Sequence, residues 1–176
     1  MRILGIDPGT RFCGLAMLVD GQPDVLQTLC RNGLHHNGEL LAQEWFRRLR
    51  SFVREQNPDT IIYEDYVFQS HARTSENAPE MWQLIGAIQC LGVVQYYPYI
   101  GVVAPMVWRK QLLGNLMPRR AGKMDAAVGA ALCARFPTDP RLASWAKTDG
   151  HTKDALGIAV TWADTQALLA REKISM

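Results

Sequence analysis

Residues 2–20 read RILGIDPGTRFCGLAMLVD, and this stretch decides the fold class. The short apolar run RILGID ends at Pro8-Gly9, which is typical of a buried strand followed by a turn. Two further apolar runs, CGLAMLVD and DVLQTLCR, are separated by the turn-like Gly21-Gln22-Pro23. Three strands at this close spacing predict an antiparallel meander.

The rest of the chain alternates helices and strands. Apolar residues recur at helical spacing from Gly38 to Glu55, and Asn57-Pro58 ends this amphipathic helix. The run TIIYED at 60–65 predicts a fourth strand, and IGVVAP at 100–105 predicts a fifth. Further helices are expected at about 79–95, at 105–114, at 124–135, and from His151 or Thr152 to about Arg171.

This order of elements predicts a single α/β domain over residues 1–176. Strands that are joined through helices pair in parallel, because a parallel connection needs a long crossover. We therefore expect a mixed five-stranded sheet, a three-strand antiparallel meander plus parallel strands, with helices on both faces. The arrangement resembles the ribonuclease-H-like fold.

Composition limits the partners and the compartment. The 176 residues are 48% hydrophobic and 20% charged, and the net charge of +2 permits a nucleic-acid partner without arguing for one. The four cysteines form no C-x-x-C pair, which favours buried free thiols over a zinc site. No apolar run approaches the length of a membrane span, and Asp7 comes too early for a signal peptide. We expect no membrane partner and a soluble protein in a reducing cytoplasm.

Two acidic residues occupy matching places at the ends of predicted strands. Asp7 ends the first strand, where an aspartate is also a common turn former. Glu64 ends the fourth strand, where glutamate is disfavoured and costly to bury unpaired. If the two strands are neighbours, both carboxylates emerge at one edge of the sheet and need a cation between them. Hard oxygen ligands suit Mg²⁺ or Mn²⁺.

The segment GHTKDALGIAV, residues 150–160, adds a second pair of polar side chains. His151 and Asp154 are three residues apart, so they share one face of a helix. They are either metal ligands or an N-terminal cap beside a bystander imidazole. An aspartate in the first helical turn has a simple alternative role, because it stabilises the helix dipole by about 0.3–1 kcal/mol.

Three segments together resemble the active-site segments of the RuvC family of Holliday-junction resolvases: ILGIDPGTRFCGLAML, IIYEDYVF and HTKDALGIAV. Their order and spacing match along nearly the whole chain. The resemblance implies that Asp7, Glu64 and Asp154 bind metal, with a fourth ligand at His151. The chain departs from the common family pattern at His151, where most members have an aspartate. The histidine would be a metal ligand or a general acid–base group.

The resemblance also implies a reaction. Two Mg²⁺ ions bridged by Asp7, or Mn²⁺ in their place, would promote in-line hydrolysis of a DNA phosphodiester bond. Lys123 would offset charge on the reacting phosphate, and the products would carry 5′-phosphate ends that a ligase can seal. The expected activity is that of a Mg-dependent crossover junction endodeoxyribonuclease, acting on four-way junctions in DNA recombination and repair.

Basic and aromatic residues lie near the expected site in the sequence. Their ordinary interpretation is a solvated surface or, for the aromatic residues, core packing. The resemblance instead implies an aromatic wedge at the junction crossover and basic contacts to the DNA backbone. The residues implied are Tyr66, Phe68, Arg73, Arg109, Lys110, Arg119, Arg120 and Lys123.

A homodimer would suit this activity, because a four-way junction has two symmetric cleavage points. By resemblance, the helix at about 79–95 contributes to the interface. The sequence does not identify a helicase partner or a preferred junction sequence.

Other classes of protein are weighed against this one. GIDPGT also resembles the first phosphate loop of sugar kinases and actin-like ATPases, but these need a second D-x-G-T motif, which this sequence lacks. YqgF-type RNA-processing nucleases share the opening motif, yet they are shorter and their second acid has a different context. A non-catalytic branched-DNA-binding protein would use the basic residues without metal.

Overall fold

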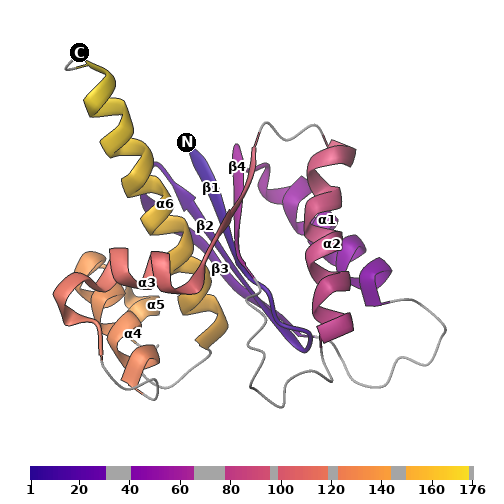
Figure 1. The fold of residues 1–176 in the computed structure, drawn as a ribbon, viewed down its shortest axis with the longest axis horizontal. Helices are drawn as coiled ribbons and strands as arrows, with labels where there is room; N and C mark the ends of the chain where they lie inside the picture. The colour runs from indigo at the N-terminus through magenta and orange to yellow at the C-terminus, as the bar shows by residue number, and fades with distance from the viewer. Residues whose placement is uncertain (31–40, 66–77, 96–98, 119–122, 144–149, 175–176) are drawn as a thin grey trace.

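The protein forms a five-stranded mixed sheet with helices on both faces (Figure 1). Its computed structural model describes residues 1–30, 41–65, 78–95, 99–118, 123–143 and 150–174. Three strands pair antiparallel: β1 (Arg2–Asp7), β2 (Phe12–Val19) and β3 (Gln22–Cys30). Two strands extend the sheet in parallel: β4 (Thr60–Glu64) and β5 (Ile100–Val103). The order β3-β2-β1-β4-β5 confirms the predicted mixed sheet.

The helices follow the predicted order. They are α1 (Leu41–Gln56), α2 (Ala78–Gln95), α3 (Pro105–Leu113), the 3-10 turn η2 (Gly114–Leu116), α4 (Met124–Arg135), α5 (Pro140–Ala143) and α6 (Gly150–Ile174). The predicted helix start at Gly38 lies outside the described residues. The last helix begins at Gly150, before the predicted His151, and continues past Arg171. The short helix α5 lies in a stretch where the sequence predicts no helix.

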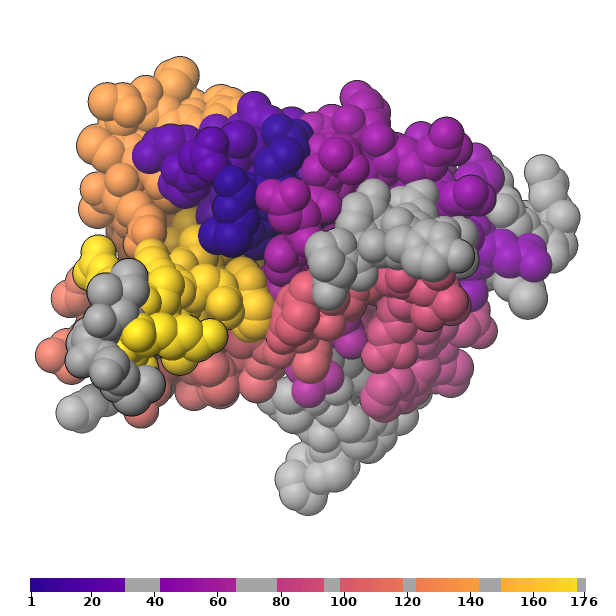
Figure 2. Space-filling view, turned by 90° about the horizontal axis from the view of Figure 1, so that it is seen from above, coloured from indigo at the N-terminus to yellow at the C-terminus, as the bar shows by residue number. Residues whose placement is uncertain are grey.

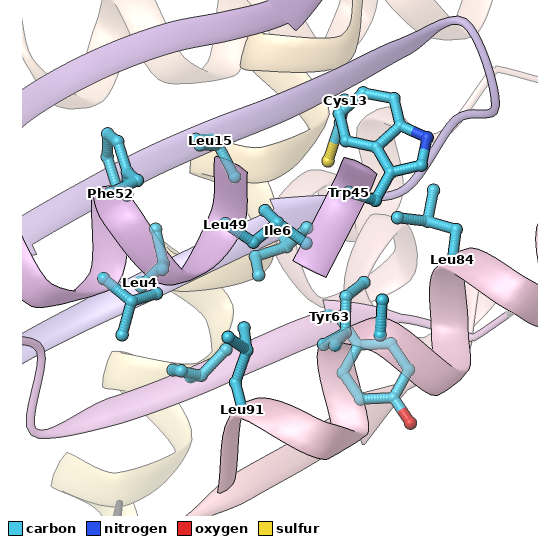
Figure 3. Packing of buried hydrophobic residues seen from close by; sticks show 14 of the residues in the cluster. Leu4, Ile6, Cys13, Leu15, Trp45, Leu49, Phe52, Tyr63, Leu84 and Leu91 are labelled. Atoms are coloured by element: carbon cyan, nitrogen blue, oxygen red, sulfur yellow. The ribbon is translucent and has the colours of Figure 1, made fainter. Parts of the chain in front are cut away.

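The sheet separates two hydrophobic clusters. Alternate residues of a strand point to opposite faces, so Leu4 and Ile6 of β1 face α1 and α2, whereas Ile3 faces α6. Figure 3 shows the first cluster, in which Trp45 of α1 and Leu84 of α2 close over the strands. The second cluster packs α3, α4 and α6 against the other face.

Two glycines let α6 lie directly on the sheet. A Cβ at Gly5 of β1 would overlap the carbonyl oxygen of Ala155, and a Cβ at Gly14 of β2 would overlap that of His151. Only glycine permits such a close approach of two backbones. Gly14 pairs with Asp7 across β2 and β1, so its close contact with His151 places the first turn of α6 beside Asp7.

The opposite end of the molecule carries the two chain ends. Figure 2 views that end, where the start of the chain (indigo) lies beside the C-terminal turns of α6 (yellow). The last residues of β1 and β4 and the first turn of α6 therefore lie at the far end of the sheet from this view.

Candidate active site

Two carboxylates lie at one edge of the sheet. β1 and β4 are parallel neighbours whose pairing runs up to Ile6 and Tyr63. The next residues are Asp7 and Glu64, so both side chains emerge where the strands end, as the sequence predicts. Each side chain is mostly buried, with 14% of its surface exposed.

The first turn of α6 brings His151 to Asp7. His151 Nδ1 lies 2.6 Å from Asp7 Oδ2, and the imidazole stacks on Phe12 with 6.1 Å between ring centroids. If the Nδ1–H donates to the carboxylate, Nε2 is the nitrogen that can accept a proton or bind a cation. The imidazole thus lies against an acid of the predicted site. Its use as a metal ligand stays a prediction.

Arg109 of α3 joins the other two acids. Its Nη2 donates to Asp154 Oδ2 at 2.8 Å and lies 3.6 Å from Glu64 Oε1. The sequence places Arg109 among the DNA contacts, but the structure brings its guanidinium in among the predicted metal ligands. The four predicted ligands therefore form two pairs, Asp7 with His151, and Glu64 with Asp154 through Arg109.

Trp108 orients Glu64, and sequence reasoning missed this residue. Its indole Nε1–H donates to Glu64 Oε2 at 2.9 Å, and the side chain is fully buried. The ring rests on Gly157 of α6, where a Cβ would come within 2.6 Å of a ring atom. A buried indole N–H needs a hydrogen-bond acceptor, so the sequence could have indicated that Trp108 has one. It does not indicate that this acceptor is Glu64.

The electrostatics of the site reflect crowded negative charge. Burial, followed by the nearby Asp7, raises the pKa of Glu64 to about 7, against the pull of Arg109 and Trp108. The same two causes raise the pKa of Asp154 to about 6, although Arg109 opposes them. Positive charge is therefore what these carboxylates need in order to stay ionised together.

The donor set fits a hard divalent cation. Three carboxylates and an imidazole are ligands that Mg²⁺ or Mn²⁺ accepts, and the raised pKa values of Glu64 and Asp154 point to a missing positive partner. Within the described parts of the chain, no three acidic, histidine or cysteine side chains already converge on one point. The guanidinium of Arg109 between Glu64 and Asp154 is one physical reason for this.

Two predicted lysines lie on the surface near this edge. Lys110 on α3 and Lys123 before α4 are both exposed. The start of α4 is tied to α6 by Lys153, whose Nζ lies 2.7 Å from Asp125 Oδ1 although the lysine is 3% exposed. Sequence reasoning did not anticipate that this lysine is buried. The other predicted DNA contacts lie outside the described residues: Tyr66, Phe68, Arg73, Arg119 and Arg120.

No protein-family model matches the chain. Two curated relatives match it over nearly its whole length, and both are named crossover junction endodeoxyribonuclease RuvC. The relative from Koribacter versatilis is 23% identical over 97% of each chain. The relative from Nocardioides sp. is 28% identical and covers 92% of this chain and 85% of its own. The chain is therefore similar to the RuvC family along nearly its whole length.

Solved structures confirm the fold. The Thermus thermophilus RuvC structure in complex with Holliday junction substrate matches with a TM-score of 0.72 at 20% identity, covering 96% of each chain. The yeast mitochondrial Holliday junction resolvase Ydc2 gives 0.67 at 14% identity, covering 97% of this chain and 80% of the other. Fowlpox virus resolvase, solved with Holliday junction DNA, gives 0.58 at 12% identity, over 94% and 99%.

Two general expectations can be compared with the structure. Among the residues that it describes, no helix has both the length and the apolar character needed to cross a membrane. The expectation of buried thiols is wrong for Cys30 and Cys90, which are exposed, whereas Cys13 is fully buried and Cys133 partly so. Burial raises the pKa of the Cys13 thiol, which keeps it protonated and inert.

Proposed function

We propose that this protein is a member of the RuvC family and a structure-selective DNA endonuclease that resolves four-way (Holliday) junctions by phosphodiester hydrolysis, in DNA recombination and repair. The observation that carries the proposal is the gathering of Asp7, Glu64, Asp154 and His151 at one edge of the sheet. Both curated relatives carry the name of this activity. A cytoplasmic location, where DNA and reducing conditions meet, is part of the same proposal.

Divalent cations belong to this proposal. Asp7, Glu64, Asp154 and His151 would hold them, and we expect two Mg²⁺ ions, for which Mn²⁺ can substitute. When bound, such ions supply charge stabilisation at the phosphate and a water of lowered pKa. Nδ1 of His151 lies against Asp7, and we propose that Nε2 ligates a cation or receives a proton. Trp108 holds Oε2 of Glu64, while Oε1 faces the Arg109 guanidinium.

Basic residues around the site support DNA binding. Lys110 and Lys123 are exposed on the side of the molecule formed by α3 and α4, and ammonium groups there can neutralise DNA phosphates. We propose that Lys123 offsets charge on the reacting phosphate. An aromatic wedge at Phe68 or Tyr66 and backbone contacts from Arg73, Arg119 and Arg120 stay predictions of the family resemblance.

We also propose a homodimer built on α2. Trp82 and Val93 of this helix leave apolar surface open to solvent, being 56% and 79% exposed. Beside them lies an almost wholly apolar groove of about 530 Å³, lined by Ala42, Gln43 and Phe46 of α1 and by Gln83, Gly86, Ala87 and Cys90 of α2. A second copy would cover this surface and would supply the second active site that two symmetric cuts require.

A cleavage assay tests the proposed activity. Synthetic four-way junctions with fixed and with mobile branch points are incubated with Mg²⁺ or with EDTA, and the products are mapped. We expect paired, symmetric nicks with 5′-phosphate ends that need metal. Asp7→Asn should bind junctions but cleave at least about 100-fold more slowly, because a charge that would hold the cations is lost. Asp24→Asn, at an exposed aspartate of β3, is the matched control.

The same assay separates the alternatives. A non-catalytic junction-binding protein would bind four-way DNA and leave it intact at every metal concentration. A YqgF-type nuclease would cleave structured RNA in preference to the junction. Cleavage by Asp7→Asn at the wild-type rate would contradict the proposed site.

A further inference from the structure

Arg109 occupies an unusual position for a residue expected to contact DNA. Its Nη2 is shared by Asp154 at 2.8 Å and Glu64 at 3.6 Å, and the side chain is only 23% exposed. The guanidinium also stacks on the Trp108 ring, 4.8 Å from its centroid. A positive charge thus sits between two carboxylates of the proposed cation site.

We propose that Arg109 is an internal counterion of the active site. Its guanidinium and a divalent cation compete for the Glu64 and Asp154 carboxylates, so that cation binding releases the guanidinium toward the DNA phosphate. This inference rests on the proposed function, because it takes these two carboxylates to be cation ligands.

The contacts of Arg109 with Glu64 and Asp154 do not satisfy the guanidinium fully, so a phosphate could replace these carboxylates as its partner. Its Nε is buried and has no hydrogen-bond partner within the described residues. An unsatisfied buried donor is unfavourable, so the present position uses only part of the guanidinium's capacity. A phosphate presents several acceptor oxygens and suits a guanidinium better than one shared Nη2 does.

The backbone beneath Arg109 is held in place, so the exchange needs only a side-chain movement. Trp108 is locked against Gly157. Gln111, two residues further along α3, donates from Nε2 to Thr165 Oγ1 at 2.7 Å and to the Thr161 carbonyl at 3.3 Å. Because α3 is fastened to α6 on both sides of Arg109, the guanidinium swings while its Cα stays.

Charge makes the competition strong. A guanidinium and a divalent cation that share two carboxylates would lie within about 4 Å of each other, where like charges in a half-buried site repel strongly. Removal of the guanidinium should therefore tighten cation binding by about tenfold or more. A residue that only preorganises the carboxylates would have the opposite effect, because its loss would loosen the site.

The test is a calorimetric titration of Mn²⁺ into the metal-free protein without DNA. Arg109→Gln removes the charge and keeps a side chain that can donate hydrogen bonds. Arg135→Gln is the matched control, because Arg135 makes a comparable ion pair with an α6 aspartate, Asp164, at 2.7 Å. We expect Arg109→Gln to bind Mn²⁺ at least about tenfold more tightly than wild type, and the control to match wild type. Equal or weaker binding by Arg109→Gln would overturn the proposal.

A second measurement uses the wild-type protein and so does not depend on the folding of the variant. A ¹H–¹⁵N spectrum follows the Arg109 Nε–H signal during Mg²⁺ addition, with Arg109→Lys used for assignment. Release predicts that the signal shifts and exchanges faster with water, while the Arg135 signal stays. An unchanged Arg109 signal at saturating Mg²⁺ would refute release. If wild type neither binds the cations nor cleaves with them, the proposed function itself has failed.

Discussion

Replacement of Glu64 by glutamine should stabilise the cation-free protein at pH 8 while it abolishes cleavage. The ionised Glu64 side chain is held in a mostly buried site beside Asp7, and a neutral amide of the same shape avoids that repulsion. The Trp108 indole can still donate to the amide oxygen of the glutamine. The residue would thus be kept for its charge at the expense of stability, as is common at active sites.

The magnitude follows from the pKa of Glu64. It is about 7 in the folded protein, against 4.5 for an ordinary glutamate, and each unit between these values is worth about 1.4 kcal/mol. The ionised side chain therefore lowers the free energy of unfolding by about 3 kcal/mol above pH 7. Between pH 4.5 and 7 the folded protein retains a proton that the unfolded chain has released, so stability falls as the pH rises through this window.

The assay is urea unfolding with EDTA present, followed by circular dichroism at pH 8 and pH 5. We expect Glu64→Gln to be about 2–3 kcal/mol more stable than wild type at pH 8 and less than about 1 kcal/mol more stable at pH 5, where folded Glu64 is itself neutral. Glu55→Gln, at a glutamate of α1 far from the site, is the control and should leave stability unchanged. Equal stabilities of Glu64→Gln and wild type at pH 8, or the same difference at both pH values, would refute the reasoning.

Three further predictions concern the scaffold, the imidazole and the dimer. Gly14→Ala should lower the free energy of unfolding by at least about 1–3 kcal/mol, because its Cβ would overlap the His151 carbonyl. In the same urea assay Gly86→Ala, which has open space around its Cβ, should leave stability unchanged or raise it. His151→Ala should need more Mg²⁺ for cleavage, whereas His151→Asp should keep activity with less dependence on pH between about 5.5 and 7.5. Mg²⁺ titrations of cleavage at two pH values test this. If the curve for His151→Ala overlays that of wild type, His151 has no role in the site. Gly86→Glu should yield a folded monomer by light scattering and circular dichroism, whereas a dimer would disprove the α2 interface.

Gly86 is a better position for a test of the interface than a buried residue of α2, because a charge in the core would unfold the protein. Ile88 also lies on α2, but it is fully buried against the sheet. A charge at Ile88 would unfold the protein and would say nothing of the dimer. A Cβ added at Gly86 would meet nothing within 4 Å, so a new carboxylate there reaches solvent in the monomer.

The part of the site that depends on strand order could be predicted from the sequence. Apolar runs that end in Asp7 and in Glu64 mark two strands, and the sheet order then shows that they are parallel neighbours. Two carboxylates at the ends of neighbouring parallel strands must share an edge of the sheet. The periodicity of residues 150–160 likewise places His151 and Asp154 on one helix face.

The contacts that depend on helix docking could not be predicted. Arg109 meets Asp154 because α3 lies along α6, and Trp108 reaches Glu64 because Gly157 leaves room for its ring. Nothing in the local pattern around WRKQ encodes the angle at which α3 docks. The sequence around Lys153 does not distinguish it from a surface lysine. In the structure its side chain is buried and its ammonium group pairs with Asp125 of α4.

Because α6 contacts the sheet at Gly5 and Gly14, the position of the helix does not depend on which side chains line the active site. Main chain touches main chain there, so the distance between the helix and the sheet is set by atoms that every residue possesses. A change at His151 alters the donor that is offered but leaves that distance untouched. A change of His151 to aspartate should therefore keep that distance, and we expect less natural variation at the two glycines than at this predicted ligand.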